Sequence, residues 1–289
     1  MSEVWTVKRV LEWATGFLQT HGSESPRLDA QLLLGHVCGL DKVQLYVQFE
    51  RPLLSGELAA FRDFIKRRAG AEPVAYILGK KELYGRSFSV DGRVLVPRPE
   101  TEHLIDLVLA HVRGRGLETP HIVDVGVGSG TIAVTLAAEL PGAVVLGVDL
   151  SPGALAVAAV NAEQHQVRER VKLVKGDALD PVRSSASVDV VVSNPPYLDD
   201  ALMASLPRDV RDYEPHLALF GGADGLDVHR KLALGAARVL RPGGLLAVEL
   251  SGDRQADEVA ALWSQAFDAP VVTRDFRQIS RVLSATRHA

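Results

Sequence analysis

Apolar residues in the first 70 positions recur at intervals of three and four, the spacing of one buried helix face. The first such stripe consists of Val7, Val10, Leu11, Ala14, Phe17 and Leu18. Ser25-Pro26 predicts the start of a second helix that runs to about Cys38, because serine caps helices and proline suits their first turn. Ser55 predicts the cap of another helix. We therefore expect a small helical bundle over residues 1–72.

Residues 73–100 have a different pattern. Apolar side chains there tend to alternate with polar ones, at Leu83, Phe88, Val90 and Val94. Alternation with a period of two is typical of a strand that has one buried face. We interpret this segment as a linker followed by a β-hairpin.

From Thr101 onward, helical and strand patterns alternate. Helices are expected at residues 101–112, from 131, and at 152–164, 225–240 and 254–266. Strands are expected at 121–125, 144–148, 171–174, 188–192 and 245–249, with two more near 271–274 and 279–284. Strands separated by helices predict a doubly wound, mostly parallel sheet, and the last two strands predict a terminal antiparallel hairpin. We expect residues 101–289 to form one α/β domain.

Composition narrows the class of protein without identifying it. The chain has 289 residues, of which 47% are hydrophobic and 24% are charged, as in ordinary globular proteins. Its net charge of −4 divides into +1 for residues 1–85 and −5 for the rest, which argues against direct binding of nucleic acid through charge. The single cysteine, Cys38, excludes an internal disulfide. The nine histidines lack metal-ligand spacing, so we predict no metal.

Neither a signal peptide nor a membrane helix is predicted. Charges at Lys8, Arg9 and Glu12 interrupt the N-terminal segment, and no run approaches the ~20 apolar residues that a membrane helix needs. We expect a monomer in the cytoplasm that does not contact a membrane.

A glycine-rich turn follows the first strand of the α/β region. The stretch from Asp124 to Gly130 places three glycines before a helix, where they allow a tight turn and close approach of a ligand. Asp149 ends the next strand, where a carboxylate can accept hydrogen bonds from both ribose hydroxyls. Asp177 ends the third strand and can accept from an adenine amine. Dinucleotides and S-adenosylmethionine both fit this set.

The tetrapeptide Asn194-Pro195-Pro196-Tyr197 directly follows the apolar run 188–193. The Asn194 side-chain oxygen and the Pro195 carbonyl are acceptors that suit the two hydrogens of a planar NH2 group. Tyr197 offers a flat face for that group, and Pro196 holds the turn. We assign all four as catalytic residues that direct methylation of an amide or exocyclic amine nitrogen, which favours S-adenosylmethionine as the cofactor.

These assignments define an expected fold and an expected cofactor site. The fold is that of a class I S-adenosylmethionine-dependent methyltransferase, with a Rossmann-like sheet of seven strands after a helical-bundle domain. The expected cofactor-binding residues are Asp124, Gly126, Val127, Gly128, Ser129, Gly130, Asp149, Leu150, Asp177, Ala178 and Asn194.

The motifs together resemble the HemK/PrmC family, the protein-(glutamine-N5) methyltransferases of peptide-chain release factors. The resemblance covers nearly the whole chain and includes Pro73 to Gly79, Val96 to Glu102, Asp124 to Gly130, Asn194 to Tyr197, Glu214-Pro215 and Gly221-Gly222. The stretch from Asp275 to Arg281 departs from the family's glycine-containing turn, which leaves the role of Arg281 open.

The resemblance implies a reaction and a partner. The substrate would be the glutamine of the Gly-Gly-Gln motif in class-1 release factors, and S-adenosylhomocysteine would be the second product. The helical N-terminal part would recognise the release factor. Pro97 and Arg98 would form part of the glutamine pocket wall. Residues 199–224 are expected to be a long irregular loop that could cover the site, with Tyr213 and Glu214 as possible gate residues.

Three alternatives stay open at this point. An adenine-N6 methyltransferase would use the same tetrapeptide, although the negative charge of residues 86–289 and the lack of a recognition domain argue against it. Methylation of a glutamine in a ribosomal protein would also use the tetrapeptide. A non-catalytic cofactor-binding module would be expected to lose the amine-binding residues, and all four are present.

Overall fold

The computed structural model describes residues 4–183, 186–263 and 266–288. Positions 264 and 265 of the helix expected at 254–266 lie outside the described residues. The chain divides into two compact units, one made of residues 1–80 and 207–213, the other of residues 81–206 and 214–289. None of the helices in the described ranges is both long and apolar enough to cross a membrane.

The first unit is a set of short helices around one apolar core. They are α1 (Val7–Thr20), α2 (Pro26–Cys38), α3 (Lys42–Val47), α4 (Ser55–Ala69), α5 (Val74–Leu78) and α10 (Arg208–Tyr213). The buried stripe of α1 packs with apolar residues of α2 and α4. The Asp41 carboxylate accepts a hydrogen bond from Gln44 N at 2.8 Å and caps α3.

Segment 207–213 belongs to this unit through polar contacts with α4. The Arg68 guanidinium lies 2.7 Å from the Asp29 carboxylate and 3.4 Å from the Asp209 carboxylate. The Tyr213 hydroxyl donates to the Gly70 carbonyl at 3.0 Å. A piece of chain that is distant in sequence thereby completes the helical unit.

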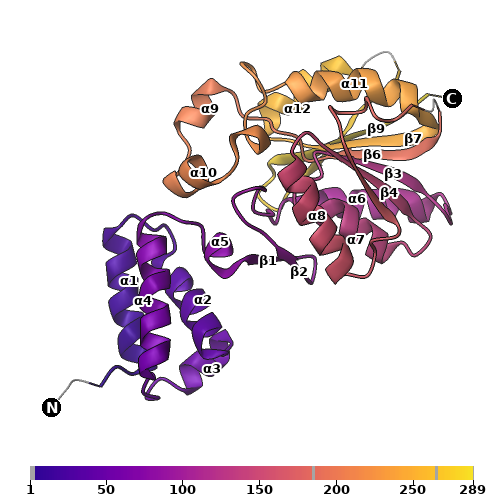
Figure 1. Cartoon of the computed structure of the whole chain (residues 1–289). Coiled ribbons are helices and arrows are strands. Elements are labelled where there is room, and N and C mark those ends of the chain that lie inside the picture. Colours follow the sequence, from indigo (N-terminus) through magenta and orange to yellow (C-terminus); the bar gives the residue numbers. More distant parts are fainter. Residues whose placement is uncertain (1–3, 184–185, 264–265, 289) are drawn as a thin grey trace. The chain divides into compact units, whose positions relative to one another are not determined.

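The second unit contains a seven-stranded sheet in the order β5-β4-β3-β6-β7-β9-β8. Figure 1 labels β4, β3, β6, β7 and β9 of this sheet. Its strands are β3 (His121–Val125), β4 (Val144–Asp149), β5 (Val171–Lys175), β6 (Val188–Ser193), β7 (Leu240–Glu249), β8 (Val271–Arg274) and β9 (Ser280–Thr286). The first five strands are parallel, while β9 runs antiparallel to both β7 and β8. This arrangement confirms the predicted fold class.

Helices cover both faces of the sheet, and an apolar core lies under each layer (Figure 1). One layer holds α6 (Thr101–Gly114), α7 (Thr131–Glu139) and α8 (Pro152–Gln164), and the other holds α11 (Asp227–Val239) and α12 (Asp253–Leu262). β6 is buried along its whole length, as expected for a central strand covered on both faces. A separate two-stranded sheet consists of β1 (Lys80–Leu83) and β2 (Arg86–Ser89).

The structure differs from the sequence expectation in three segments. Helix α5 occupies part of the predicted linker, and β7 begins at Leu240 rather than Leu245. The chain pairs with β6 at Leu240, bulges over 241–244 and resumes pairing at Leu245. The loop expected at 199–224 contains α9 (Asp200–Ala204), α10 and a 3-10 turn, η1 (His216–Ala218). These helices are too short to produce a clear hydrophobic period.

Candidate active site

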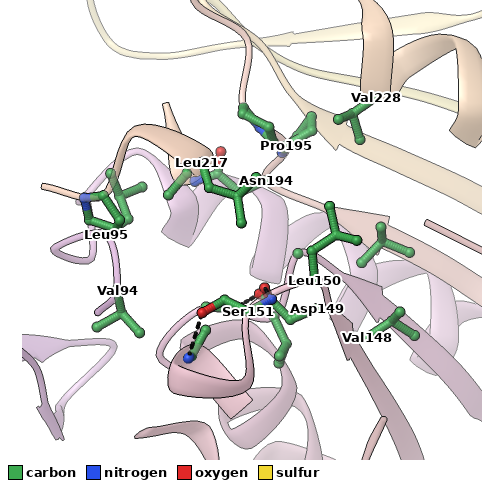
Figure 2. Close-up of a pocket in the computed structure, with 18 of the residues that line it drawn as sticks. Val94, Leu95, Val148, Asp149, Leu150, Ser151, Asn194, Pro195, Leu217 and Val228 are labelled. Carbon is green, nitrogen blue, oxygen red and sulfur yellow. Dashed lines mark hydrogen bonds between the residues drawn. The ribbon is translucent and has the colours of Figure 1, made fainter. Parts of the chain in front are cut away.

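The carboxyl ends of β3, β4, β5 and β6 surround one cavity of about 330 Å³. The strand order reverses between β3 and β6, where open α/β sheets bind their ligands. Figure 2 shows Asn194 and Pro195 on one side of the cavity, with Asp149, Leu150 and Ser151 on another. The lining includes these predicted residues: Pro97, Arg98, Gly126, Val127, Gly128, Ser129, Asp149, Leu150, Asp177, Ala178, Asn194, Pro195 and Pro196.

The glycine turn after β3 is held against β4 and leaves space above it. The backbone N–H groups of Gly126 and Val127 both donate to the Val148 carbonyl, at 2.8 and 3.0 Å. Gly126 and Gly128 have φ angles of 73° and 53°, a region that other residues rarely adopt. A side-chain carbon at either position would meet no atom closer than 3.8 Å. Glycine is therefore required by the backbone, and the turn stays open to a ligand.

Asp149 connects this turn to the start of α8. One carboxylate oxygen accepts from Gly128 N and the other from Ser151 N, each at 2.9 Å. Each oxygen keeps a further acceptor position. The carboxylate is thus fixed in place and can still accept two hydrogen bonds from a ligand.

Asp124 and Gly130 lie beside the cavity rather than in its lining. Asp124 is fully buried, and one of its oxygens accepts from Ala133 N at 3.0 Å. The other oxygen has no partner among the described residues. Burial raises the pKa of this carboxyl to about 7, and the nearby Asp149 charge adds to the shift. Gly130 caps α7 and packs against Ala158, so its role in the structure is close helix packing.

Asp177 has a partner that the sequence did not suggest. The Lys231 ammonium lies 2.6 Å from its carboxylate, and both residues line the cavity. Both side chains are partly exposed, at 40% for Asp177 and 49% for Lys231, so the pair contributes little to stability. It does place a positive charge beside the position where an adenine amine was expected.

The tetrapeptide turns away from β6 at the cavity wall. The Ser193 hydroxyl donates to the Val125 carbonyl at 2.7 Å and joins the ends of β6 and β3. Tyr197 is half-buried and is absent from the cavity lining among the described residues. Burial raises the pKa of its hydroxyl, and the charge of Glu249 adds to this effect.

Two glycines pack directly on the tetrapeptide backbone. A side-chain carbon at Gly221 would lie 2.5 Å from the Pro196 carbonyl oxygen. A side-chain carbon at Gly225, which has a φ angle of 74°, would collide with the Tyr197 carbonyl oxygen. The segment that contains Gly221 and Gly225 therefore packs against the backbone of the tetrapeptide and supports it.

The segment that contains Pro97 and Arg98 is held by Glu214. One Glu214 oxygen accepts from Arg98 Nη2 at 2.6 Å, and the other accepts from Val96 N at 3.2 Å. The Glu214 side chain is only 2% exposed, so this ion pair is shielded on one side. Glu214 thus fixes the cavity wall, whereas Tyr213 belongs to the helical unit.

Other residues near the site have structural partners. Glu102 accepts from Tyr84 N at 2.8 Å. Arg281 lies 2.8 Å from the Asp275 carboxylate and 4.0 Å from that of Glu100. In the part of the chain that the structure describes, no group of three or more histidine, cysteine or acidic side chains is arranged to hold a metal.

Sequence reasoning missed several residues of the cavity. Val94 and Leu95 form part of its wall, and Leu217 and Val228 approach from the region after the tetrapeptide (Figure 2). Thr101 also lines it. The four apolar side chains carry no chemical signature in the sequence. Thr101 could have been noticed only because it follows the Val96–Pro99 segment.

Two family models match the chain, the PrmC N-terminal domain over residues 9–79 and the methyltransferase small domain over residues 104–205. A release factor glutamine methyltransferase of Geobacter sulfurreducens is 45% identical over 263 residues, which is 91% of this chain and 90% of that protein. One of Chlorobaculum tepidum is 43% identical over 288 residues, 98% of this chain and 97% of that protein.

A solved structure supports the fold independently. A methyltransferase from Pyrococcus furiosus matches with a TM-score of 0.51 and 17% identity, over 72% of this chain and 92% of that chain. At this identity the likeness shows the shared fold alone.

Proposed function

We propose the reaction of this chain from one premise: the chain belongs to the family of release factor glutamine methyltransferases. It transfers a methyl group from S-adenosyl-L-methionine to the side-chain amide nitrogen, N5, of the glutamine in the Gly-Gly-Gln motif of class-1 peptide-chain release factors. The nitrogen forms a bond to the methyl carbon as the sulfur–methyl bond breaks, so S-adenosyl-L-homocysteine is the second product, and the nitrogen releases one proton to solvent. One observation carries the proposal: Asn194 and Pro195 line the same cavity as the glycine turn and Asp149.

The chemistry of the cavity lining supports S-adenosylmethionine as the cofactor. The absence of side chains at Gly126 and Gly128 would let a ligand approach the backbone closely, and the fixed Asp149 carboxylate would hold the ribose hydroxyls. Asp177 and Ala178 line the part of the cavity suited to the adenine. When bound, S-adenosylmethionine supplies a methyl group that its sulfonium makes electrophilic.

The protein must make a poor nucleophile react. The lone pair of an amide nitrogen is delocalised into the carbonyl group, so the nitrogen attacks weakly. The Asn194 Oδ1 and the Pro195 carbonyl would accept the two amide hydrogens and fix the nitrogen in the cavity. Two acceptors also stabilise the positive charge that develops on the nitrogen. Catalysis then rests on positioning and on exclusion of water.

Further residues have roles in the proposed complex. Pro196 keeps the turn rigid. Tyr197 does not line the cavity among the described residues, so it would contact the glutamine amide only outside that lining. Pro97 and Arg98 form the wall that receives the glutamine side chain, with Arg98 held by Glu214. The helical unit of residues 1–80 and 207–213 would recognise the body of the release factor. Since release factors act on the ribosome, the cytoplasm is the proposed location.

Incorporation of labelled methyl groups tests the substrate. Purified protein would be incubated with labelled S-adenosylmethionine and the release factors of the same organism, intact or with the Gly-Gly-Gln glutamine replaced by alanine. Label on the intact factor alone supports the proposal. Label on a ribosomal protein or on nucleic acid, with none on release factors, would replace the substrate and keep the fold.

A variant of the tetrapeptide tests the assigned acceptor. Asn194→Ala should lower turnover by roughly 10²- to 10³-fold, the range for loss of one preorganised hydrogen-bond partner of the transition state. Cofactor affinity measured by calorimetry should fall far less than turnover, because the glycine turn and Asp149 are unchanged. Unchanged turnover would show that Asn194 does not hold the substrate amide.

A further inference from the structure

Two buried polar side chains, Thr101 and Glu249, are linked to Asn194 by hydrogen bonds, and the proposed reaction gives neither of them a role. Nδ2 of Asn194 lies 3.3 Å from Oγ1 of Thr101, and that hydroxyl lies 2.8 Å from Oε2 of Glu249. Thr101 is 4% exposed and Glu249 is 2% exposed. Such groups are costly to bury, so a short chain of hydrogen bonds at the wall of the site indicates a specific purpose.

Three elements bring these side chains together. Ser193 pairs with Val248 in the parallel ladder between β6 and β7, so Asn194 and Glu249 lie at the same end of adjacent strands. Thr101 is the first residue of α6, which packs against β7. The hydrogen-bond chain therefore joins residues at the end of β6, the start of α6 and the end of β7.

The chain of hydrogen bonds has a fixed direction. An ionised carboxylate can only accept, so the Thr101 hydroxyl must donate its single hydrogen to Glu249. The hydroxyl is then left with acceptor capacity toward Asn194. Only the NH2 group of the Asn194 amide can donate to this oxygen, so the Oδ1 end of the amide points away from Thr101.

We propose that Thr101 and Glu249 are positioning residues that hold the Asn194 amide with Oδ1 toward the substrate nitrogen. The inference rests on the proposed function, because the orientation of this amide matters when the substrate is an NH2 group. A reversed Asn194 would present its own NH2 group to the substrate donor, and no hydrogen bond would form. The chain of hydrogen bonds thus selects one of two side-chain orientations of nearly equal shape.

The charge on Glu249 controls this selection. Burial raises the pKa of this carboxyl to about 7, while the Thr101 hydroxyl opposes the shift. The Glu100 charge raises this pKa further, and the Arg281 and Arg98 charges lower it. The Glu249 charge in turn raises the pKa of Tyr197. Protonated Glu249 can donate a hydrogen bond to Thr101. The Thr101 hydroxyl is then free to donate to Asn194, so the hydrogen bonds no longer fix the orientation of the Asn194 amide. Turnover should therefore rise with pH through about 7.

Matched threonine variants separate this role from packing. Thr101→Val keeps the shape and removes the hydroxyl, whereas Thr101→Ser keeps the hydroxyl and removes a methyl group. Thr135→Val is the control, since Thr135 is fully buried and its hydroxyl has no hydrogen-bond partner among the described residues. Each variant would be assayed for kcat on the release factor and for S-adenosylmethionine affinity.

We expect Thr101→Val to lower kcat by roughly 10- to 100-fold, the range for misplacing a catalytic group, with cofactor affinity close to that of the wild type. Thr101→Ser and Thr135→Val should retain near-normal kcat. Glu249→Gln should abolish the rise of kcat with pH near neutrality. The proposal is overturned if Thr101→Val is fully active, or if Thr101→Ser is as impaired as Thr101→Val.

A measurement without substrate keeps this test separate from that of the proposed function. The side-chain NH2 protons of Asn194 can be assigned by nuclear magnetic resonance through comparison with Asn194→Ala. Their exchange with water should be faster in Thr101→Val than in the wild type and Thr101→Ser. Equal exchange in all three proteins would refute the inference. If the wild type failed to methylate release factors, the proposed function would fail, and the exchange rates alone would decide the orientation of Asn194.

Discussion

Replacement of Asp149 by asparagine removes one negative charge from the proposed cofactor site and changes the side-chain volume very little. Both carboxylate oxygens already accept a backbone N–H, from Gly128 and Ser151, each at 2.9 Å. Asparagine has one oxygen, so its NH2 group must face one of these two donors. The variant would therefore lose an acceptor for one ribose hydroxyl of the proposed cofactor, and its NH2 group would face one backbone N–H without forming a hydrogen bond.

The structure sets the size of the expected effect. A hydrogen bond to a charged group contributes about 1.5–3 kcal/mol when shielded from water. Asp149 is half-buried, which reduces this figure. We expect Asp149→Asn to weaken binding of S-adenosylhomocysteine by about 1–3 kcal/mol, a factor of roughly 5 to 150.

Calorimetry with a modified ligand isolates the ribose contact. The wild type and Asp149→Asn would each be titrated with S-adenosylhomocysteine and with its 2′,3′-dideoxy counterpart. Removal of the hydroxyls should cost the wild type more affinity than it costs the variant. An identical loss in both proteins would show that the ribose is held elsewhere. Thermal unfolding without ligand would reveal damage to the turn itself.

Two further variants probe the supports of the site. Gly225→Ala should lower the free energy of unfolding by roughly 1–3 kcal/mol and reduce turnover, because the new methyl group would displace the Tyr197 carbonyl. Gly114→Ala, where nothing lies within 4 Å of the added carbon, is the control, and equal stability of the two variants in chemical denaturation would contradict the packing argument. For Asp124, burial raises the folded-state pKa from 3.8 to about 7, so its contribution to stability is full below pH 3.8 and falls as pH rises toward 7, by up to about 1.4 kcal/mol per unit. Asp124→Asn should therefore gain stability relative to the wild type between pH 4.5 and 7.5, and a constant difference across this range would show that the carboxyl is ionised at little cost.

The sequence predicted the sheet and the place of the site because both depend on local patterns. Each apolar run of the parallel strands is short and ends in a polar or glycine-rich stretch, and parallel strands bring such ends together at one edge. Asn194 and Asp149 were therefore expected near one another although they lie on different strands. The cavity lining agrees with that expectation for both residues.

The partners of these residues could not be predicted in the same way. Lys231 lies 54 residues from Asp177, and Glu214 lies 116 residues from Arg98. Such pairs depend on how helices and loops pack over the sheet, which hydrophobic periodicity does not specify. Asp124 shows the same limit, because the sequence placed it in the cofactor site while the fold buries it beneath the turn.

The helical unit is discontinuous in sequence, because α10 belongs to it while both neighbours of segment 207–213 along the chain belong to the α/β unit. Deletion of residues 1–80 would keep α10 but remove Arg68 and Gly70, the partners of Asp209 and Tyr213. A chimaera that exchanges the helical unit between relatives must therefore exchange residues 207–213 as well. Substitutions on α4 and on α10 must therefore be compatible with one another, even though more than 130 residues separate them in the sequence.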